Sequence, residues 1–396
     1  MAASDPIVIV DSARTPIGAF QGDLKDLTAP ELGAVAIRAC IERAETPLDS
    51  VDEVLFGCVL TAGLGQAPAR QAALGAGLPP STGAVTINKM CGSGMKAVML
   101  AHDLLLAGSA KIIVAGGMES MSNAPYLLDR ARAGYRLGHG SLLDHMFLDG
   151  LEDAYEKGRL MGSFAEECAQ SYGFTREAQD EYALASLTRA QKATADGSFA
   201  SEIVPVTVKA GKTERQVKHD ELPLKAIPDR IPHLKPVFRD GGTVTAANSS
   251  AISDGAATLV LMRRSEADRC ALKSLATIAG HATYANAPAL FPTAPIGAIR
   301  RLLHQTGWSA YDVDLFEINE AFAVVVMAAM RDLGLAHEKV NLHGGACALG
   351  HPIGASGARI LVTLLAALAK YGLRRGIAAL CIGGGEATAM AIERID

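Results

Sequence analysis

The chain has 396 residues, of which 49% are hydrophobic and 20% are charged, and its formal net charge is −5. This length allows two or three domains with substantial cores, and the composition argues against long disordered stretches. A mildly acidic chain without a Lys/Arg-rich block argues against a nucleic-acid partner. The longest apolar runs, such as residues 360–369, are about ten residues too short for a membrane span, so we expect no membrane partner.

The two ends of the chain and its cysteines indicate the cellular compartment of the protein. The first residues enter an apolar run at once, without the basic and hydrophobic regions of a secretory leader. The last residues carry no retention or peroxisomal tripeptide. The seven cysteines lie far apart and form no C-x-x-C pair, so neither a disulfide framework nor a zinc knuckle is predicted. We therefore expect a cytoplasmic protein.

Strands and helices are expected to alternate along the chain. Residues 6–13 and 111–117 are short β-branched apolar runs, typical of buried strands. Residues 30–44 and 95–108 have apolar side chains at the i, i+3, i+4 spacing of a helix and end near turn or polar residues. This order predicts an α/β fold with a mostly parallel sheet and helices on its faces.

Residues from about 119 to 248 differ in composition from the rest of the chain. They contain more Met, Tyr, Arg and acidic residues, and they include an amphipathic helix over residues 175–193. We interpret them as a long insertion over one face of the sheet. Because ligands of open α/β sheets bind beyond the carboxyl ends of the strands, such an insertion can wall a pocket. A contact with another subunit is the alternative.

The chain contains an internal repeat. A helix followed by "VDEVLF" near the start matches a helix followed by "VDLFEI" far downstream, so that Val51 corresponds to Val313. A second pair of segments aligns Gly94 with Gly357, and the two offsets agree within one residue. This agreement favours a duplicated α/β unit. The expected domains are an N-terminal half of residues 1–118 plus 249–271, an inserted domain of residues 119–248 and a C-terminal half of residues 272–396.

Cys91 is the first candidate for chemistry. It stands before two glycines and a serine, where a helix is expected to begin. The unpaired N–H groups and the macrodipole of a helix N-terminus favour negative charge, so a cysteine there tends toward its reactive thiolate. A small buried hydrophobe beside a tight turn is the other interpretation.

The second half supplies the matching candidates. Asn319 and Glu320 follow a strand at its carboxyl edge, and Cys381 ends an apolar strand before three glycines. His351 lies in a glycine-rich loop before the helix that repeats the one after Cys91. If the halves are related by pseudo-symmetry, His351 and Cys91 occupy matching loop-to-helix junctions and can face one crevice. A turn role for His351 and core packing for Cys381 remain the alternatives.

These residue types fit one kind of chemistry. A thiolate can attack a thioester or ketone carbonyl when a neighbouring imidazole takes the thiol proton. The resulting oxyanion requires N–H donors, which glycine-rich turns can bring close. A second thiol can act as acid and base on a carbon-bound proton. The run "GGGEATA" resembles a phosphate loop but lacks its Gly-Lys-Ser/Thr ending. It is therefore only weak evidence for the binding of nucleotide phosphates.

Several motifs occur in a recognisable order: "VDSARTPIGAF", "NKMCGSGMKA", "AGGMESMSNAPY", "MGSFAE", "GTVTAANSSAISDGAA", "NEAFA", "GGACALGHPIGASGAR" and "CIGGGEA". With them the chain resembles the thiolases, and among these the acetyl-CoA C-acetyltransferases, over essentially its whole length. The resemblance implies an α/β thiolase fold, a duplicated five-layer αβαβα core with a loop domain inserted in its first half.

The resemblance also implies an activity. The chain would be an acyltransferase that reversibly condenses two acetyl-CoA molecules to acetoacetyl-CoA and CoA, by ping-pong catalysis through a cysteine acyl-enzyme. Coenzyme A thioesters would be its substrates, and no cofactor and no metal would be needed. A homotetramer built from two dimers is the assembly that the resemblance suggests.

The resemblance further assigns roles to single residues. Cys91 would be the nucleophile, His351 its base, and Cys381 the group that removes the α-proton of acetyl-CoA. Asn319 would hold the water that completes one oxyanion hole with His351, and the N–H groups of Cys91 and Gly383 would form the other. The expected substrate and CoA contacts are Ser250, Lys225, Arg230, Met161, Phe238, Phe291 and Phe322.

The sequence departs from the family pattern at several positions. Phe291 and Tyr126 replace a methionine and a histidine of many bacterial short-chain thiolases, and resemble the mitochondrial enzymes, some of which accept a 2-methyl branch. Pro223 stands where those enzymes place the tyrosine of a potassium site, so potassium activation is not expected. His343 and Glu386 are further departures near the catalytic loops, and they leave the acyl preference open.

Three other functions compete with this interpretation. A degradative 3-ketoacyl-CoA thiolase of broader or 2-methyl-branched specificity would use the same residues. A decarboxylating 3-ketoacyl synthase would share the scaffold but lack a cysteine at the position of Cys381. A catalytically silent thiolase-like scaffold or lipid carrier would be expected to lose the nucleophile or its base first, and Cys91 and His351 are both present.

Overall fold

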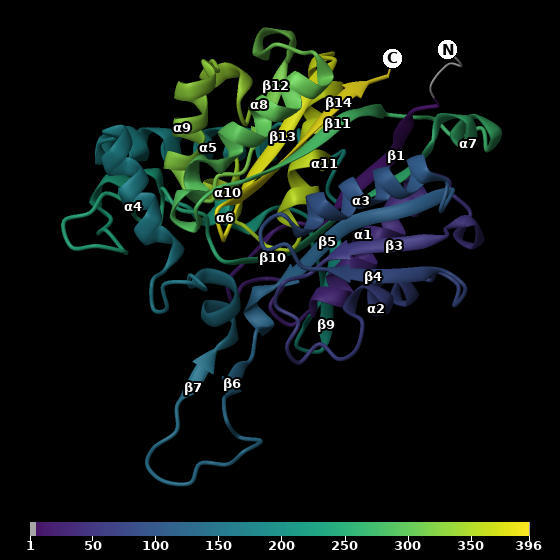
Figure 1. Ribbon diagram of the computed structural model, residues 1–396. Coiled ribbons are helices and arrows are strands. Elements are labelled where there is room, and N and C mark those ends of the chain that lie inside the picture. Colours follow the sequence, from purple (N-terminus) through teal and green to yellow (C-terminus); the bar gives the residue numbers. More distant parts are fainter. Residues whose placement is uncertain (1–4, 396) are drawn as a thin grey trace.

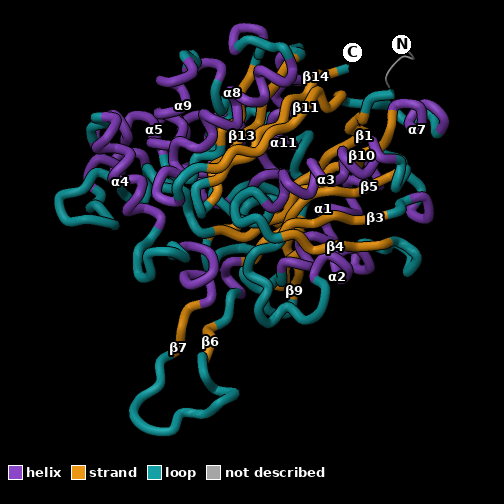
Figure 2. The backbone as a smooth tube through the Cα atoms, viewed as in Figure 1, coloured by secondary structure: helices purple, strands orange, loops and turns teal. Residues whose placement is uncertain are grey.

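The computed structural model describes residues 5–395; residues 1–4 and 396, which the predicted domains include, lie outside this range. A single mixed sheet runs through its centre in the order β12-β13-β14-β11-β1-β10-β5-β3-β4, with β2 paired to β10 beside this path (Figures 1 and 2). Its strands are β1 (Ile7–Arg14), β2 (Gly18–Ala19), β3 (Glu53–Gly57), β4 (Gly83–Ile87), β5 (Ile112–Ser120), β10 (Ser253–Arg263), β11 (Ala276–Ala285), β12 (Leu315–Ile318), β13 (Arg375–Ile382) and β14 (Glu386–Arg394).

The prediction of a mostly parallel sheet is wrong. β3 runs parallel to β4 and β5, and β12 runs parallel to β13, but every other pair in the sheet is antiparallel. In the second half, the turn formed by the three glycines reverses the chain between β13 and β14. Gly384 and Gly385 have φ angles of +92° and +85°, a backbone conformation that favours glycine. In the first half, β10 returns after the insertion and pairs antiparallel with β5.

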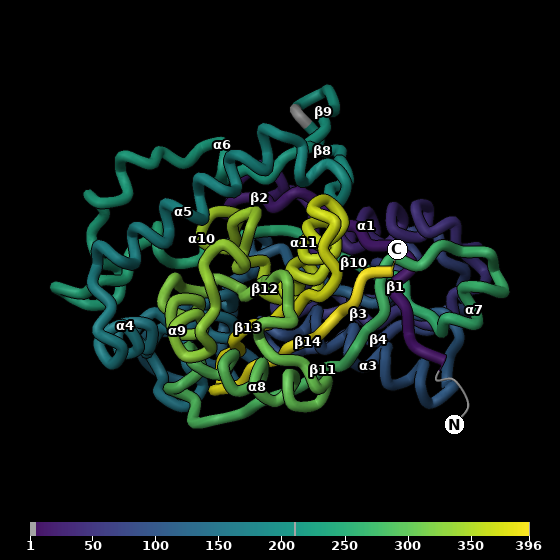
Figure 3. The backbone as a smooth tube through the Cα atoms, turned by 90° about the horizontal axis from the view of Figure 1, so that it is seen from above, coloured from purple at the N-terminus to yellow at the C-terminus, as the bar shows by residue number. Residues whose placement is uncertain are grey.

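The helices form three layers around the strands (Figures 1 and 3). α1 (Ala29–Arg43) and α2 (Pro68–Gly75) cover one outer face, and α8 (Ala294–Thr306) and α9 (Ala323–Leu333) cover the other. α3 (Ser93–Ala107) and α11 (Ser356–Tyr371) pack on each other between the two groups of strands. The groups join only through the short β1–β11 pairing, in which Val8 and Ile9 oppose two residues of β11. This arrangement is the expected five-layer αβαβα core.

Local sequence explains where these helices start and which faces they bury. Thr28 and Glu31 form a capping box at the start of α1, which satisfies otherwise unpaired N–H groups. α1 then buries one apolar stripe against the sheet and leaves its other face in water. α11 is buried on nearly all sides up to Leu368, because strands lie on both sides of it. Its sequence is accordingly apolar around the whole helix.

Two glycines of the repeat meet where the central helices cross. A Cβ atom built on Gly94 of α3 would lie 2.9 Å from the backbone nitrogen of Ala358. A Cβ atom on Gly357 of α11 would collide with the backbone nitrogen of Met95. Only glycine therefore permits this close approach of the two helices. The crossing brings together the loops that precede α3 and α11, which carry Cys91 and His351.

Part of the inserted segment packs against the core, and another part projects from it. Thr175 caps α5 (Arg176–Ala195), which confirms the helix predicted from its periodicity. The hairpin of β6 and β7 extends away from the body (Figure 1). No helix within residues 5–395 is both long and apolar enough to cross a bilayer. The remaining elements are β6 (Tyr126–Leu128), β7 (Leu142–Asp144), α4 (Met161–Tyr172), β8 (Val206–Ala210), β9 (Thr213–Val217), α6 (Glu221–Lys225), α7 (Arg264–Arg269) and α10 (Ala346–Leu349).

Candidate active site

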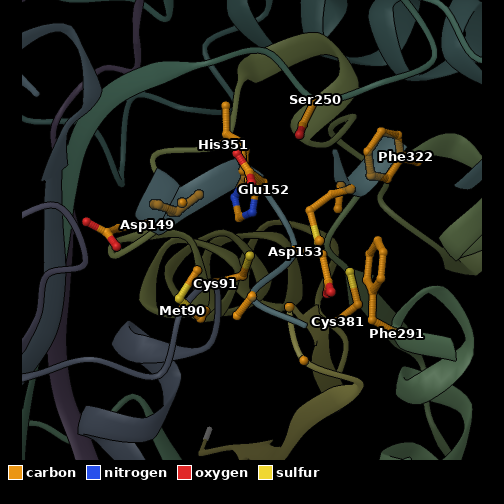
Figure 4. Close-up of a pocket in the computed structure, with 18 of the residues that line it drawn as sticks. Met90, Cys91, Asp149, Glu152, Asp153, Ser250, Phe291, Phe322, His351 and Cys381 are labelled. Carbon is orange, nitrogen blue, oxygen red and sulfur yellow. The ribbon is translucent and has the colours of Figure 1, made fainter. Parts of the chain in front are cut away.

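A cavity of about 300 Å³ is lined by residues of both halves and of the insertion (Figure 4). Part of its wall is the stretch of residues 148–155, which overlaps a single π-helical turn, Phe147–Leu151. Such turns occur often at functional sites. The predicted site residues that line the cavity are Cys91, His351, Cys381, Gly383, Ser250, Met161, Phe291 and Phe322.

Each reactive group reaches the cavity from the end of a regular element. Cys91 lies in the turn two residues before α3, and His351 lies in the loop between α10 and α11. Cys381 is the penultimate residue of β13, and Gly383 follows in the glycine turn. Figure 4 shows the two sulfur atoms and the imidazole around a shared space. The fold therefore brings together groups separated by up to 290 positions in the chain.

The surroundings of Cys91 favour a protonated thiol over the thiolate that its place before a helix suggested. Burial raises the pKa of Cys91 to about 11, although the backbone N–H groups of Gly383 and Cys91 itself act in the opposite direction. The loss of hydration outweighs these two N–H groups, because a charged sulfur loses more solvation on burial than they return. At neutral pH Cys91 is a thiol that needs a base. The two N–H groups that act on its sulfur are those expected to form an oxyanion hole.

His351 has the tautomer that such a base requires. Its Nδ1 lies 2.5 Å from the hydroxyl oxygen of Ser356, and that hydroxyl donates its hydrogen to the carbonyl of Pro352 at 3.0 Å. Nδ1 must therefore carry the hydrogen, which leaves the Nε2 lone pair free. Nε2 is buried and has no partner among residues 5–395. Burial, with a smaller effect of Arg359, lowers the pKa of His351 to about 3, so the ring is neutral at physiological pH.

Ser356 was not identified from the sequence, although it lies inside the "GHPIGASGAR" motif. We expect Ser356→Ala to lower kcat roughly tenfold, the value of one lost hydrogen bond that selects the Nδ1–H tautomer. KM should change little, because Ser356 does not line the cavity. Steady-state rates measured alongside thermal unfolding separate this effect from a structural one. A variant with reduced stability but unchanged kcat would contradict the positioning role.

Asn319 lies behind the cavity wall rather than on it. It directly follows β12 and is buried, and its Oδ1 is 3.5 Å from a guanidinium nitrogen of Arg359. Its Nδ2 has no partner in the described part of the chain, as is also true of His351 Nε2. A buried polar atom without a partner is costly unless something else binds it. Two such atoms fit the expected water-binding role of this pair.

Three predicted substrate contacts do not line the cavity. Phe238 packs edge-to-face on Phe322, with ring centres 6.0 Å apart, and so supports the wall from behind. Lys225 and Arg230 line a separate hollow of about 260 Å³, and Lys225 forms an ion pair of 2.5 Å with Glu221.

Consecutive residues of the chain line the two hollows. Ser250 lines the cavity with the two cysteines, and the next residue, Ala251, lines the hollow with Lys225 and Arg230. A role of these two basic side chains at the phosphates of CoA stays a prediction.

Comparison with known proteins decides the family. A family model described as "Thiolase, N-terminal domain" matches residues 7–265, and one described as "Thiolase, C-terminal domain" matches residues 272–394. This chain belongs to the thiolase family. It is therefore an acyltransferase, and the resemblance stated from its motifs is confirmed.

Proteins similar to this thiolase match it over essentially its whole length. The cytosolic acetyl-CoA acetyltransferase of mouse (Mus musculus) is 49% identical over 396 residues, which cover 99% of each chain. The crystal structure of the acetyl-CoA acetyltransferase of Bacillus anthracis has a TM-score of 0.96 at 41% identity and covers 100% of both chains. Acat5 thiolase of Ascaris suum, solved in complex with coenzyme A, has a TM-score of 0.92 at 41% identity over 98% of this chain and 100% of its own. The thiolase fold is confirmed.

The two departures noted near the catalytic loops of this thiolase lie outside the cavity wall. His343 packs edge-to-face on Phe199, with ring centres 5.6 Å apart, and its Nε2 is 3.3 Å from the hydroxyl of Tyr371. Glu386 forms an ion pair with Lys89, two residues before Cys91. Any effect of these residues on acyl preference is therefore indirect.

Glu119 is a second residue of this thiolase to which sequence reasoning gave no role. It lies in β5 and is fully buried, and its carboxylate accepts hydrogen bonds of 2.9–3.1 Å from the backbone nitrogens of Val59, Leu60 and Gly354. Burial raises its pKa to about 7, although these hydrogen bonds oppose the shift. Glu119 thereby ties the loop after β3 to the loop of His351. A charged residue within an apolar strand was the available signal.

Proposed function

We propose that this thiolase is an acetyl-CoA C-acetyltransferase, which reversibly condenses two acetyl-CoA molecules to acetoacetyl-CoA and CoA. The observation that carries the proposal is that Cys91, His351 and Cys381 line one small cavity. The names of the mouse and Bacillus anthracis proteins support the substrate, and the coenzyme A complex of the Ascaris suum thiolase supports binding of its carrier.

The first half-reaction acetylates Cys91. Its thiol proton moves to Nε2 of His351 as the sulfur attacks the thioester carbonyl of acetyl-CoA. The N–H groups of Cys91 and Gly383 stabilise the oxyanion. When the carbonyl re-forms, the bond to the CoA sulfur breaks, and that sulfur takes a proton from Cys381. CoA leaves, and the site holds acetyl-Cys91 with a His351 imidazolium and a Cys381 thiolate, two opposite charges whose attraction offsets the burial that disfavours either one alone.

The second half-reaction forms the carbon–carbon bond. The Cys381 thiolate takes an α-proton from a second acetyl-CoA, and the carbanion attacks the acetyl group on Cys91. The bond to the Cys91 sulfur breaks, that sulfur recovers its proton from His351, and acetoacetyl-CoA leaves. Burial raises the pKa of Cys381 well above its ordinary value, so its thiolate is a strong base once it forms.

The pKa values predict a flat pH profile for acetylation. His351, with a pKa of about 3, stays unprotonated at neutral pH, and Cys91, with a pKa of about 11, stays protonated. We therefore expect kcat/KM for acetylation to vary by less than about twofold across the neutral range. Stopped-flow measurement of CoA release tests this expectation. A limb near the ordinary histidine pKa of about 6.5 would indicate a resting thiolate–imidazolium pair instead.

A panel of three substrates tests the proposed substrate. Met161, Phe291 and Phe322 narrow the cavity, so thiolysis of acetoacetyl-CoA is expected to have a higher kcat/KM than thiolysis of 3-oxohexanoyl-CoA or 2-methylacetoacetyl-CoA. Equal or faster cleavage of either competitor would favour a degradative thiolase of broader or branched-chain specificity. Failure to cleave all three would favour a silent scaffold or lipid carrier.

We also propose that the reaction needs no cofactor and no metal at the reacting atoms, since side chains and backbone N–H groups account for every proton transfer and charge above. A cytoplasmic location is supported by the name of the mouse relative and by cysteines that are all free in the structure.

A homotetramer is the proposed assembly. The β6–β7 hairpin, which projects from the body, exposes Tyr126, Leu137 and Leu142 with exposed fractions of 66%, 84% and 65%. β4, one of the two edge strands of the sheet, pairs on one side only and exposes Val85. Two such apolar surfaces on one chain suit two kinds of contact between copies. Light scattering should give a tetramer for the full chain and a dimer after residues 130–140 are replaced by a short linker.

A further inference from the structure

Three metal-ligating side chains converge outside the catalytic cavity. His102 and Asp103 are neighbours on α3, and His281 lies on β11 of the other half of the fold. Nδ1 of His102 is 3.2 Å and Nε2 of His281 is 2.9 Å from the same carboxylate oxygen of Asp103. The imidazole rings meet edge-to-face, with centres 5.0 Å apart. None of the three residues lines the cavity of Cys91.

We propose that His102, Asp103 and His281 bind one divalent transition-metal cation of the zinc class, with water completing its coordination. Two imidazole nitrogens and one carboxylate oxygen form a donor set that suits zinc, nickel or cobalt better than magnesium or calcium. The donor atoms lie within 4.8 Å of one another, and no other His/Cys/Asp/Glu group in residues 5–395 meets this condition.

Two of the three distances between donor atoms are close to those of an occupied site, and all three are within 4.8 Å. Zinc–nitrogen and zinc–oxygen bonds are about 2.0–2.2 Å, so two donors on a tetrahedral ion are roughly 3.3–3.5 Å apart. The observed 3.2 Å and 2.9 Å therefore need to open by only a few tenths of an ångström. His102 and His281 expose 13% and 16% of their side chains, so packing holds the rings, whereas Asp103 exposes 52% and leaves access for the ion and its waters.

One carboxylate oxygen of Asp103 lies within hydrogen-bond distance of a nitrogen of each histidine. The competing explanation is that the histidines only donate hydrogen bonds to Asp103.

A bound ion would join the two halves of the fold. α3 belongs to the first half and carries Cys91 just before its start, whereas β11 belongs to the second. His102 lies roughly 14 Å along the helix axis from the first residue of α3, at 1.5 Å per residue, too far to touch a carbonyl bound at Cys91. The expected effect of the ion is therefore on thermal stability rather than on turnover.

Cobalt(II) titration of the full-length, chelator-treated protein tests the site. We expect one equivalent to bind with visible ligand-field absorption and without a thiolate charge-transfer band, which separates imidazole from cysteine ligation. His281→Gln keeps an amide that can donate to Asp103 but removes the imidazole, and it should weaken binding roughly 100-fold or more. His304→Gln, at an exposed histidine on α8, is the matched control and should bind as the wild type does.

Zinc-dependent thermal unfolding of the same proteins gives a second readout. Zinc should raise the unfolding midpoint of the wild type and of His304→Gln, but not that of His281→Gln, while the metal-free midpoints stay similar. Equal cobalt binding by wild type and His281→Gln would overturn the proposal. So would the absence of binding to the wild type, or a charge-transfer band that Cys91→Ser abolishes.

Discussion

Acetyl-CoA is expected to add one acetyl group to the native protein and none to the Cys91→Ser variant. The reason is that Cys91 is the thiol facing both the neutral imidazole of His351 and the N–H group of Gly383. Condensation should fall by roughly 10⁴-fold or more, as when a nucleophile is lost from a unit whose members act together. Intact-mass spectrometry followed by peptide mapping measures both the number and the position of acetyl groups.

Cys270→Ser is the matched control for this experiment. Cys270 is also a partly exposed free thiol, but it does not line the cavity, so its variant should acetylate at the native rate. Acetylation of the Cys91→Ser protein at another cysteine would show that the nucleophile has been misassigned. Normal condensation by that variant would remove covalent catalysis altogether.

Cys381→Ala is expected to accept an acetyl group on Cys91 but to form acetoacetyl-CoA roughly 10³- to 10⁴-fold more slowly. Acetylation can proceed because the departing CoA sulfur can take its proton from the His351 imidazolium. Carbon–carbon bond formation fails because no thiolate remains to remove the α-proton. Quenched-flow measurement of acetyl-enzyme and of product separates the two half-reactions.

Exchange of the acetyl protons of acetyl-CoA with deuterated water provides an independent check on Cys381. The wild type should incorporate deuterium, and the Cys381→Ala variant should not. Replacing Cys381 by alanine removes only one sulfur atom from the lining of the cavity, so we expect the variant to fold. Thermal unfolding verifies this. Condensation or exchange at a near-native rate would exclude Cys381 as the base.

Much of this protein could be predicted from local patterns. The amphipathic pattern of residues 175–193 predicted α5, and the repeated segments predicted matching helices at α3 and α11. Such patterns succeed because periodicity and capping act between residues only a few positions apart. The motifs around Cys91 and His351 likewise stand next to the helices that position them, so the family is recognisable from the order of residues alone.

Strand direction was predicted wrongly, and the state of Cys91 was left open between two interpretations, for a common reason. Alternating strands and helices suggested parallel pairing, but the turn at Gly383–Gly385 and the return of β10 make most pairs antiparallel. The helix N-terminus suggested a thiolate, but burial raises the pKa of Cys91 to about 11. Both outcomes depend on what packs against a segment from elsewhere in the chain, which its own residues do not specify.

The sequence by itself determined the family and the alternation of strands and helices, and it predicted which two thiols and which imidazole are the reactive groups. Tertiary structure alone decided that Ser356 selects the His351 tautomer, that Lys225 and Arg230 line a different hollow, and that His281 joins His102 and Asp103. The physical reason is distance along the chain. Side chains 178 positions apart share no periodicity or motif, and only the packing of α3 against the strands of the other half brings their donor atoms together.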